Sequence, residues 1–300
     1  MCGMIASPYD EQLARIPVSE HRVDVDGTET AWWEYGPADA PVLVLVHGFR
    51  GDHHGLEPVV AQLPGFRIVS PDLPGFGESA TFTGRPHDID AYAEWLGAFI
   101  RAIGIEGPYT LLGHSFGSIV AANAVARGLA PQRLVLVNPI GAPALEGPRG
   151  VMTRLAVLYY RTAAALPERA GFALLRNGAI VRVMSVTMAK TRSKSLRRWI
   201  HDQHDRYFSA FGDRDAVLEA FRASVSHDVS EYAHVIDVPT LLVAAERDDV
   251  TPLEAQHRLV TLFPDATLEV IPEVGHLIHY ETPGDAAARI LRFLRSGAHA

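Results

Sequence analysis

The segment 113–117, Gly-His-Ser-Phe-Gly, constrains the fold more than any other part of the chain. It lies where the apolar, strand-like run 109–112 ends and a helical pattern begins. A sharp strand-to-helix turn strains the backbone of its central residue, so the positions two before and two after it must be small. Gly113 and Gly117 meet that requirement. We therefore expect the Ser115 hydroxyl to project above the carboxyl edge of a sheet.

Strand and helix patterns alternate along most of the chain. An Asp-Gly pair at 26–27 predicts a hairpin, and the apolar run 42–46 predicts a strand buried on both faces. The expected strands are 21–26, 29–35, 42–46, 66–70, 109–112, 133–137, 240–244 and 267–271. The expected helices are 91–103, 117–127, 253–262 and 285–295. This order predicts an α/β fold with a mostly parallel central sheet flanked by helices.

The alternation breaks between residues 139 and 238. This span is helical in pattern, most clearly at 151–166 and 192–211. We therefore predict a core of residues 1–138 and 239–300 and a helical insertion, 139–238, after the sixth strand. The segment from Pro148 to Arg198 contains eleven Lys and Arg residues but a single acidic residue, Glu168. Such a basic surface is either a solvated helical face or an attraction for an anionic substrate or a membrane surface, which leaves peripheral membrane contact open.

Composition excludes several classes of protein. The net charge of −8 argues against nucleic-acid binding, and the single cysteine, Cys2, excludes an intrachain disulfide. The first twenty residues lack the features of a secretory signal, and no run is apolar enough to span a membrane, so we expect a cytoplasmic protein. No His/Cys cluster has metal-ligand spacing and no G-x-G-x-x-G follows a strand, so we expect neither a metal nor an organic cofactor.

A serine hydroxyl becomes a good nucleophile only when a base takes its proton. His276 follows the last expected strand, which places it at the same sheet edge as Ser115. His114 adjoins the serine, but its side chain is expected to point away across the turn, and His279 lies three residues deeper in the loop. A carboxylate must then orient the imidazole. Asp248 and Asp249 both follow the strand 240–244, and either one can reach this edge.

Four motifs in sequence order carry a resemblance to a known family. They are His47-Gly48-Phe49, the segment 72–79 (DLPGFGES), the segment 113–117, and Gly275-His276 with Glu281-Thr282-Pro283 downstream. With them, residues 20–297 resemble the α/β-hydrolase superfamily, among its esterase-like and lipase-like members that have a serine nucleophile and a helical cap. The resemblance implies the α/β-hydrolase fold with a cap inserted after the sixth strand.

The resemblance also implies roles for individual residues. Asp248 matches the acid of the family's G-x-x-D-x-x-x-P pattern, although Ala245 replaces the glycine. Some relatives take the acid from the end of the sixth strand, where this chain has Asn138. The oxyanion hole would consist of the backbone N–H groups of Phe49 and Phe116.

Further residues are candidates for substrate contact. Gly48 allows the chain to approach the nucleophile closely, and His114 adjoins it. Arg50 either binds a substrate carboxylate or phosphate or is a solvated loop charge. Tyr159 belongs to a helical apolar stripe that is either core or the wall of an acyl-binding tunnel.

The resemblance implies a serine hydrolase that cleaves a carboxylic ester or thioester through an acyl-serine intermediate. The apolar stripe and the basic residues of the insertion favour a hydrophobic or anionic acyl compound. Superfamily members with an aspartate nucleophile are excluded by Ser115. Two alternatives remain open. One is a carbon–carbon bond hydrolase, lyase or acyltransferase that uses the same triad on a carboxylate-bearing metabolite, and the other is a ligand-binding protein without catalysis.

Overall fold

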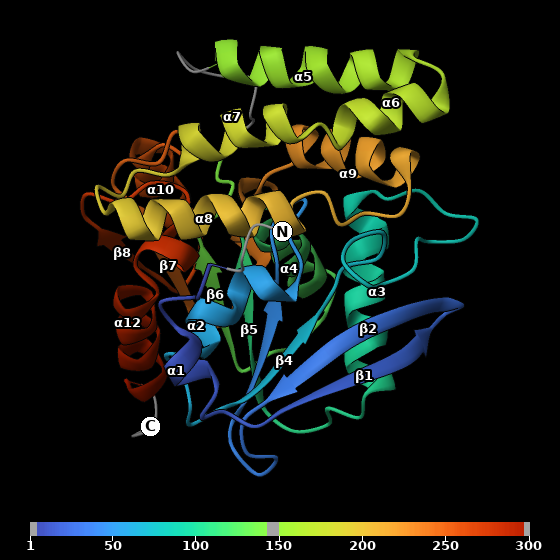
Figure 1. Ribbon diagram of the computed structural model, residues 1–300. Helices are drawn as coiled ribbons and strands as arrows, with labels where there is room; N and C mark the ends of the chain where they lie inside the picture. Colours follow the sequence, from blue (N-terminus) through green and yellow to red (C-terminus); the bar gives the residue numbers. More distant parts are fainter. Residues whose placement is uncertain (1–4, 143–149, 297–300) are drawn as a thin grey trace.

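The computed structural model describes residues 5–142 and 150–296, with side chains of helix α5 described from Arg154 onward. Eight strands form one sheet in the order β1-β2-β4-β3-β5-β6-β7-β8. Their bounds are β1 Val18–Val25, β2 Thr28–Tyr35, β3 Val42–Val46, β4 Arg67–Pro71, β5 Tyr109–His114, β6 Arg133–Val137, β7 Thr240–Ala245 and β8 Ala266–Ile271. Helices cover both faces of this sheet (Figure 1). The predicted α/β fold class, a mostly parallel sheet flanked by helices, is confirmed, since every expected strand is present.

The first two strands form the predicted hairpin. Asp26 and Gly27, with φ of 50° and 82°, make the turn, as a two-residue hairpin loop requires. β2 then pairs antiparallel with β4, and all later strand pairs are parallel. Parallel strands end at one common edge, so the loops after β3, β5, β7 and β8 meet there.

Side-chain alternation divides the core into two layers. In β3, Val44 and Val46 belong to the cluster beneath α3 (Ile89–Ala102) and α4 (Phe116–Ala126). Leu43 and Leu45 belong to the opposite cluster, with α2 (Glu57–Val60) and α12 (Pro283–Arg295). Successive strand residues point to opposite faces, so a strand covered on both sides must be apolar throughout.

Short helices complete the core. They are α1 Asp10–Leu13, η1 His53–Leu56, η2 Val229–Glu231, η3 Ala233–Val235, α10 Leu253–Val260 and α11 Ile278–Glu281. None of the helices in the described ranges is both long and apolar enough to cross a membrane.

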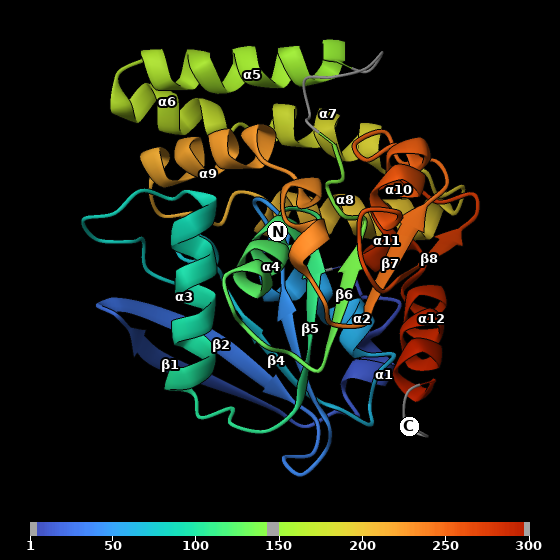
Figure 2. The same ribbon diagram turned by 180° about the vertical axis from the view of Figure 1, so that it is seen from behind.

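Five further helices lie between β6 and β7 in the chain and are called the cap helices below. They are α5 Gly150–Ala165, α6 Glu168–Leu175, α7 Gly178–Met188, α8 Lys194–Tyr207 and α9 Arg214–Ser226. Both views show them over the carboxyl edge of the sheet (Figure 2). The spans 151–166 and 192–211 correspond to α5 and α8, whereas the sequence pattern did not separate α6, α7 and α9. The loop between α8 and α9 contacts the core at Phe211, which forms an isolated β-bridge with Phe76.

Candidate active site

Ser115 lies between the end of β5 and the first turn of α4, in a strained backbone conformation with φ of 52° and ψ of −117°. A Cβ atom on Gly113 would overlap the carbonyl group of Gly117, and one on Gly117 would overlap the carbonyl of Val46. Only glycine therefore allows β5, α4 and β3 to approach this closely. The turn raises the Ser115 hydroxyl above the sheet, as the sequence predicts.

Three side chains from three different loops form a continuous series that begins at this serine. Ser115 Oγ lies 2.8 Å from His276 Nε2, and His276 Nδ1 lies 2.8 Å from Asp248 Oδ2. Asp248 is 1% exposed and His276 is 8% exposed. An ionised carboxylate only accepts hydrogen bonds, so the imidazole donates from Nδ1 and its Nε2 lone pair faces the serine hydroxyl. This arrangement can remove the hydroxyl proton as the oxygen attacks.

The electrostatic surroundings keep Asp248 ionised. Burial alone would favour its neutral form, but the electrostatic attraction of the His276 ring and hydrogen bonds from His276 and Thr251 outweigh burial and hold the pKa of Asp248 below its ordinary value. Two backbone N–H groups, of Val250 and Thr251, also donate to this carboxylate. Asp249 instead forms an ion pair with Lys190. Of the two carboxylates that the sequence leaves open, the structure brings Asp248 to the histidine.

Two backbone N–H groups near Ser115 are available to an oxyanion. Gly48 begins a turn in which the Gly51 N–H donates to the Gly48 carbonyl at 3.0 Å. A Cβ atom on Gly48 would lie 3.3 Å from Ser115 Cβ, so this turn runs directly beside the nucleophile. Within residues 5–142 and 150–296, the N–H groups of Phe49 and Phe116 donate to no protein acceptor. Both sequence candidates for an oxyanion hole are therefore free to bind a ligand.

Aromatic rings surround the side chain of Phe49. The Phe49 ring contacts Phe76 and Phe116 of the core and Tyr160 and Phe221 of the cap helices, with centroid distances of 5.9–6.2 Å. The sequence placed Tyr160 on the same apolar stripe as Tyr159, but it did not single out Phe221, because the proximity of both rings to Phe49 depends on how α5 and α9 pack.

His114 and His279 lie near His276 but take no part in its hydrogen bonds to Ser115 and Asp248. The His114 ring centroid is 5.7 Å from that of His276 and 4.2 Å from that of His279. Burial and the neighbouring His276 lower the pKa of His114 to about 3, and burial and His114 lower that of His279 as well. Both rings are therefore neutral at pH 7. His114 Nε2 and His279 Nδ1 have no hydrogen-bond partner in the described residues.

Arg50 requires a correction. The sequence offered a solvated loop charge or a ligand for a substrate anion, but the side chain is only 1% exposed. Its four hydrogen bonds go to Phe208, Tyr160, Leu175 and Ser209. All four belong to the span 150–226, which holds the cap helices and is called the cap region below. The solvated alternative is therefore wrong, because the cap helices cover the guanidinium and take up its donors.

Tyr159 is half-buried within the cap region. Its hydroxyl donates to the Leu174 carbonyl at 3.1 Å, and its ring meets that of Tyr160 edge-on. In this arrangement the hydroxyl joins α5 to α6, and the substrate contact of Tyr159 stays a prediction.

One group of side chains has the donor set of a metal site. Ligand atoms of Asp52, His53 and His54 lie within 4.8 Å of one another, and the sequence pattern had missed this group. However, His53 Nδ1 bonds to Asp72 at 2.9 Å, and Asp52 accepts from the His54 N–H at 3.0 Å as the N-cap of η1. These bonds explain the group as a connection between two loops, and we assign it no metal.

Comparison with known proteins places these observations in context. The family model described as the alpha/beta hydrolase fold matches residues 41–283. A dihydrolipoyllysine-residue acetyltransferase component of the acetoin cleaving system from Pseudomonas putida is 28% identical over 280 residues, which is 91% of this chain and 69% of that protein. A 2-hydroxy-6-oxo-6-(2'-aminophenyl)hexa-2,4-dienoic acid hydrolase from Metapseudomonas resinovorans is 24% identical over 293 residues, 92% of this chain and 90% of that protein.

A solved structure supports the fold. The crystal structure of a membrane phospholipase A, described as a bacterial virulence factor, aligns with a TM-score of 0.77 at 22% identity. The alignment covers 97% of this chain and 89% of that one. At this identity, the similarity concerns the architecture.

Proposed function

The chain belongs to the α/β-hydrolase family, and from that premise we propose that it is a serine hydrolase that cleaves a carboxylic ester or thioester through an acyl-serine intermediate. The observation that carries the proposal is the continuous series Asp248, His276 and Ser115, joined by two contacts of 2.8 Å. Nucleophile, base and orienting acid at hydrogen-bond distance are what acyl transfer at a serine requires.

The proposed reaction has two halves. Ser115 Oγ attacks the carbonyl carbon while His276 Nε2 takes the hydroxyl proton, and the Phe49 and Phe116 N–H groups bind the developing oxyanion. Collapse of this intermediate expels the alcohol or thiol, which leaves with the proton from His276. Water then attacks the acyl-serine with His276 again as base, and the acid is released. Asp248 remains ionised and stabilises the imidazolium in both halves.

The proposed substrate has a hydrophobic acyl group. The aromatic rings around Phe49 support this choice, because they provide an apolar wall next to the nucleophile. An anionic acyl group is less well supported, since Arg50 already donates four hydrogen bonds to the cap region.

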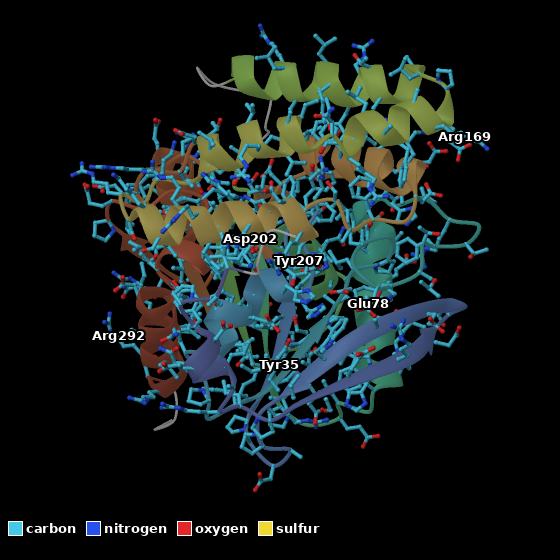
Figure 3. The ribbon with its side chains drawn as sticks, in the orientation of Figure 1. Tyr35, Glu78, Arg169, Asp202, Tyr207 and Arg292 are labelled. Atoms are coloured by element: carbon cyan, nitrogen blue, oxygen red, sulfur yellow. The ribbon has the colours of Figure 1, made fainter. Side chains whose placement is uncertain are left out.

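Exposed side chains on α5 and α7 support a lipid-like substrate and peripheral membrane contact. Four apolar side chains on α5 and α7 are exposed: Leu155 at 55%, Leu158 at 61%, Val183 at 65% and Val186 at 56%. Arg154, Arg161 and Arg182 are exposed on the same two helices, and Figure 3 shows Arg169 at the outer edge of the cap region. Apolar and basic side chains together suit an anionic lipid surface. We therefore propose a cytoplasmic enzyme that contacts membranes reversibly.

The membrane part has its own experiment. Sedimentation with vesicles of phosphatidylcholine alone and with added phosphatidylserine should show binding only to the anionic vesicles. Leu158→Glu should abolish this binding, and Val235→Glu, at an exposed apolar position away from the cap helices, should not. Equal binding of both variants would contradict the assigned surface.

The catalytic part is tested with p-nitrophenyl esters from acetate to palmitate. Wild type should hydrolyse them, Ser115→Ala should lose about 10⁴-fold or more in kcat/KM, and Ser70→Ala, at a buried serine outside the site, should retain activity. The preferred chain length then shows the depth of the acyl site. Wild type no faster than Ser115→Ala at every chain length would refute ester hydrolysis.

The names of the two relatives favour a second candidate, which is acyl transfer or carbon–carbon bond cleavage by the same triad on a carboxylate-bearing compound. Product analysis separates the two candidates. Acyl transfer would move the p-nitrophenyl acyl group to an added alcohol or thiol in preference to water. Carbon–carbon cleavage would require turnover of a substrate that contains no ester.

A further inference from the structure

Arg50 has a backbone conformation that arginine rarely adopts. Its φ is 58°, in the turn that the Gly51 N–H closes onto the Gly48 carbonyl. This left-handed region favours glycine, which has no Cβ to collide with the backbone. A strained residue persists when its surroundings hold it in place, and here the side chain provides the hold.

The guanidinium reaches two helix ends. Its Nη2 donates to the carbonyl of Leu175, the last residue of α6, at 2.7 Å. Its Nε donates to the carbonyl of Phe208, the residue that follows α8, at 3.0 Å. Tyr160 Oη and Ser209 Oγ accept further bonds at 3.3 and 3.4 Å. The rings of Phe208 and Phe211 lie 4.7 and 5.1 Å from the guanidinium carbon.

The charge of Arg50 has no carboxylate partner among the described residues. A buried cation is unfavourable unless something compensates it. The last carbonyls of a helix are unpaired within the helix and carry partial negative charge. The carbonyl groups at the ends of α6 and α8 therefore compensate the charge of Arg50. This compensation requires the cap helices to keep the positions that they have in the structure.

Arg50 is also the direct neighbour of a candidate oxyanion donor. The Phe49 N–H precedes it by one peptide, and the Phe49 ring packs between Phe116 of the core and Tyr160 of the cap helices. Tyr160 in turn is stacked on Phe221 at 3.7 Å and accepts from Arg50. A change in the Arg50 backbone would displace the Gly51 N–H, which bonds to the Gly48 carbonyl at 3.0 Å. Because that carbonyl and the Phe49 N–H belong to the same peptide plane, the direction of the Phe49 N–H would change with it.

We propose that Arg50 is a positioning residue, which uses the cap helices as a fixed support to aim the Phe49 N–H at the carbonyl oxygen of a substrate on Ser115. The proposal rests on the serine-hydrolase function proposed above, in which that N–H binds the oxyanion. Arg50 does not touch the substrate. The ends of α6 and α8 therefore help to set the geometry of the oxyanion hole, although they contribute no group to it.

The experiment compares Arg50→Met with wild type. Loss of one oxyanion donor lowers kcat by about 10²- to 10³-fold, and we expect a loss of this size with KM changed by less than about threefold. Reaction of Ser115 with a fluorophosphonate should slow in parallel, because its phosphoryl oxygen uses the same hole. Arg50→Lys keeps the charge but lacks the planar guanidinium that reaches both helix ends, so its kcat should lie between those of wild type and Arg50→Met.

Arg214→Met is the matched control. Arg214 also donates to a cap carbonyl, that of Leu166, but it makes no described contact with residues 48–51. We expect its kcat to match wild type. If both variants lose kcat equally, or if Arg50→Met changes only KM, the positioning role is refuted. Should Arg50→Met fail to fold, Tyr160→Phe removes one acceptor of the guanidinium and should lower kcat with little change in KM.

Hydrogen exchange makes the test independent of the substrate. Peptides that cover residues 48–51 should exchange faster in Arg50→Met than in wild type, and Arg214→Met should not differ from wild type in these peptides. If wild type reacts with neither esters nor the fluorophosphonate, the proposed function fails, and exchange still decides whether Arg50 orders this turn. Unchanged exchange in Arg50→Met would overturn the inference whatever the reaction is.

Discussion

The side chain of Asn138 donates from Nδ2 to the main-chain carbonyl of His276 at 2.7 Å. Asn138 lies at the end of β6 with φ of 45°, and its Oδ1 accepts from the Ala245 N–H at 3.1 Å. One amide thus joins the ends of β6 and β7 to the loop that carries the imidazole. A carboxylate in this position would present an oxygen to the His276 carbonyl, so the amide suits this contact, and the carboxylate that contacts the His276 ring belongs to Asp248 on the next loop.

The first prediction concerns this amide. Asn138→Asp should lower the free energy of unfolding by about 2 kcal/mol or more, because it leaves a buried carbonyl unpaired and brings a charge against it. Urea unfolding measures the loss. Asn177→Asp is the control, since Asn177 caps α7 as an acceptor and aspartate caps equally well, with a change of less than about 0.5 kcal/mol. Equal stabilities of the two variants would refute the assigned role of Asn138.

The second prediction separates the adjacent aspartates. Asp248→Asn should lower kcat about 10³- to 10⁴-fold, because an amide no longer holds the imidazole in the tautomer that accepts the serine proton. Asp249→Asn removes an exposed partner of Lys190 and should stay within about twofold of wild type. Ester hydrolysis at saturating substrate measures both. The reverse order of activities would assign the acid to Asp249.

The third prediction tests the turn around Ser115. Gly117→Ala should destabilise the fold by about 2 kcal/mol or more, since its Cβ would overlap the Val46 carbonyl and backbone must shift. Gly107→Ala has open space and should change stability by less than about 0.5 kcal/mol. Chemical denaturation of both proteins gives the comparison. A stable Gly117→Ala variant would show that β3 and α4 are farther apart than described.

The fourth prediction concerns pH. Burial lowers the pKa of His204 in the folded protein to about 3, whereas the pKa of a histidine in the unfolded chain is about 6.5. Between these values the unfolded chain binds the extra proton, so the stability is complete above about pH 6.5 and falls as the pH is lowered. His114 has a similarly lowered pKa of about 3 and contributes in the same direction.

Replacement of one such histidine should flatten this dependence. Between about pH 7 and 5, His204→Leu should lose less stability than wild type, by on the order of 1 kcal/mol per pH unit below the unfolded pKa. His234→Leu, at an exposed position, should keep the wild-type slope. Thermal melts at several pH values supply the measurement. Parallel curves for His204→Leu and wild type would mean that His204 is protonated in the folded state.

The sequence was sufficient where a local rule governs the structure. Apolar runs such as 42–46 predicted strands covered on both faces, and the Asp-Gly pair at 26–27 predicted the hairpin. Gly113 and Gly117 marked the turn at Ser115 because a side chain at either position meets backbone. Where several helices follow one another without strands, as in α6, α7 and α9, the apolar pattern did not separate them, because their buried faces depend on partners in the same region.

The candidate site was predictable in its residue types but not in its contacts. Ser115 and His276 could be proposed because parallel strands end at one edge. From position alone, Asp248 and Asp249 were equivalent, and the resemblance to the family favoured Asp248. Their difference in contacts arises from the loop after β7, where N–H groups of Val250 and Thr251 turn one carboxylate toward the imidazole.

By itself, the sequence determined the order of the strands, the hairpin turn and the strained turn at Ser115, since each depends on neighbours a few positions away. The tertiary structure alone decided that Arg50 is buried, because its acceptors Leu175 and Phe208 lie 125 and 158 positions away along the chain. A charge beside a turn is solvated by default, and here two helix ends from distant segments replace the water.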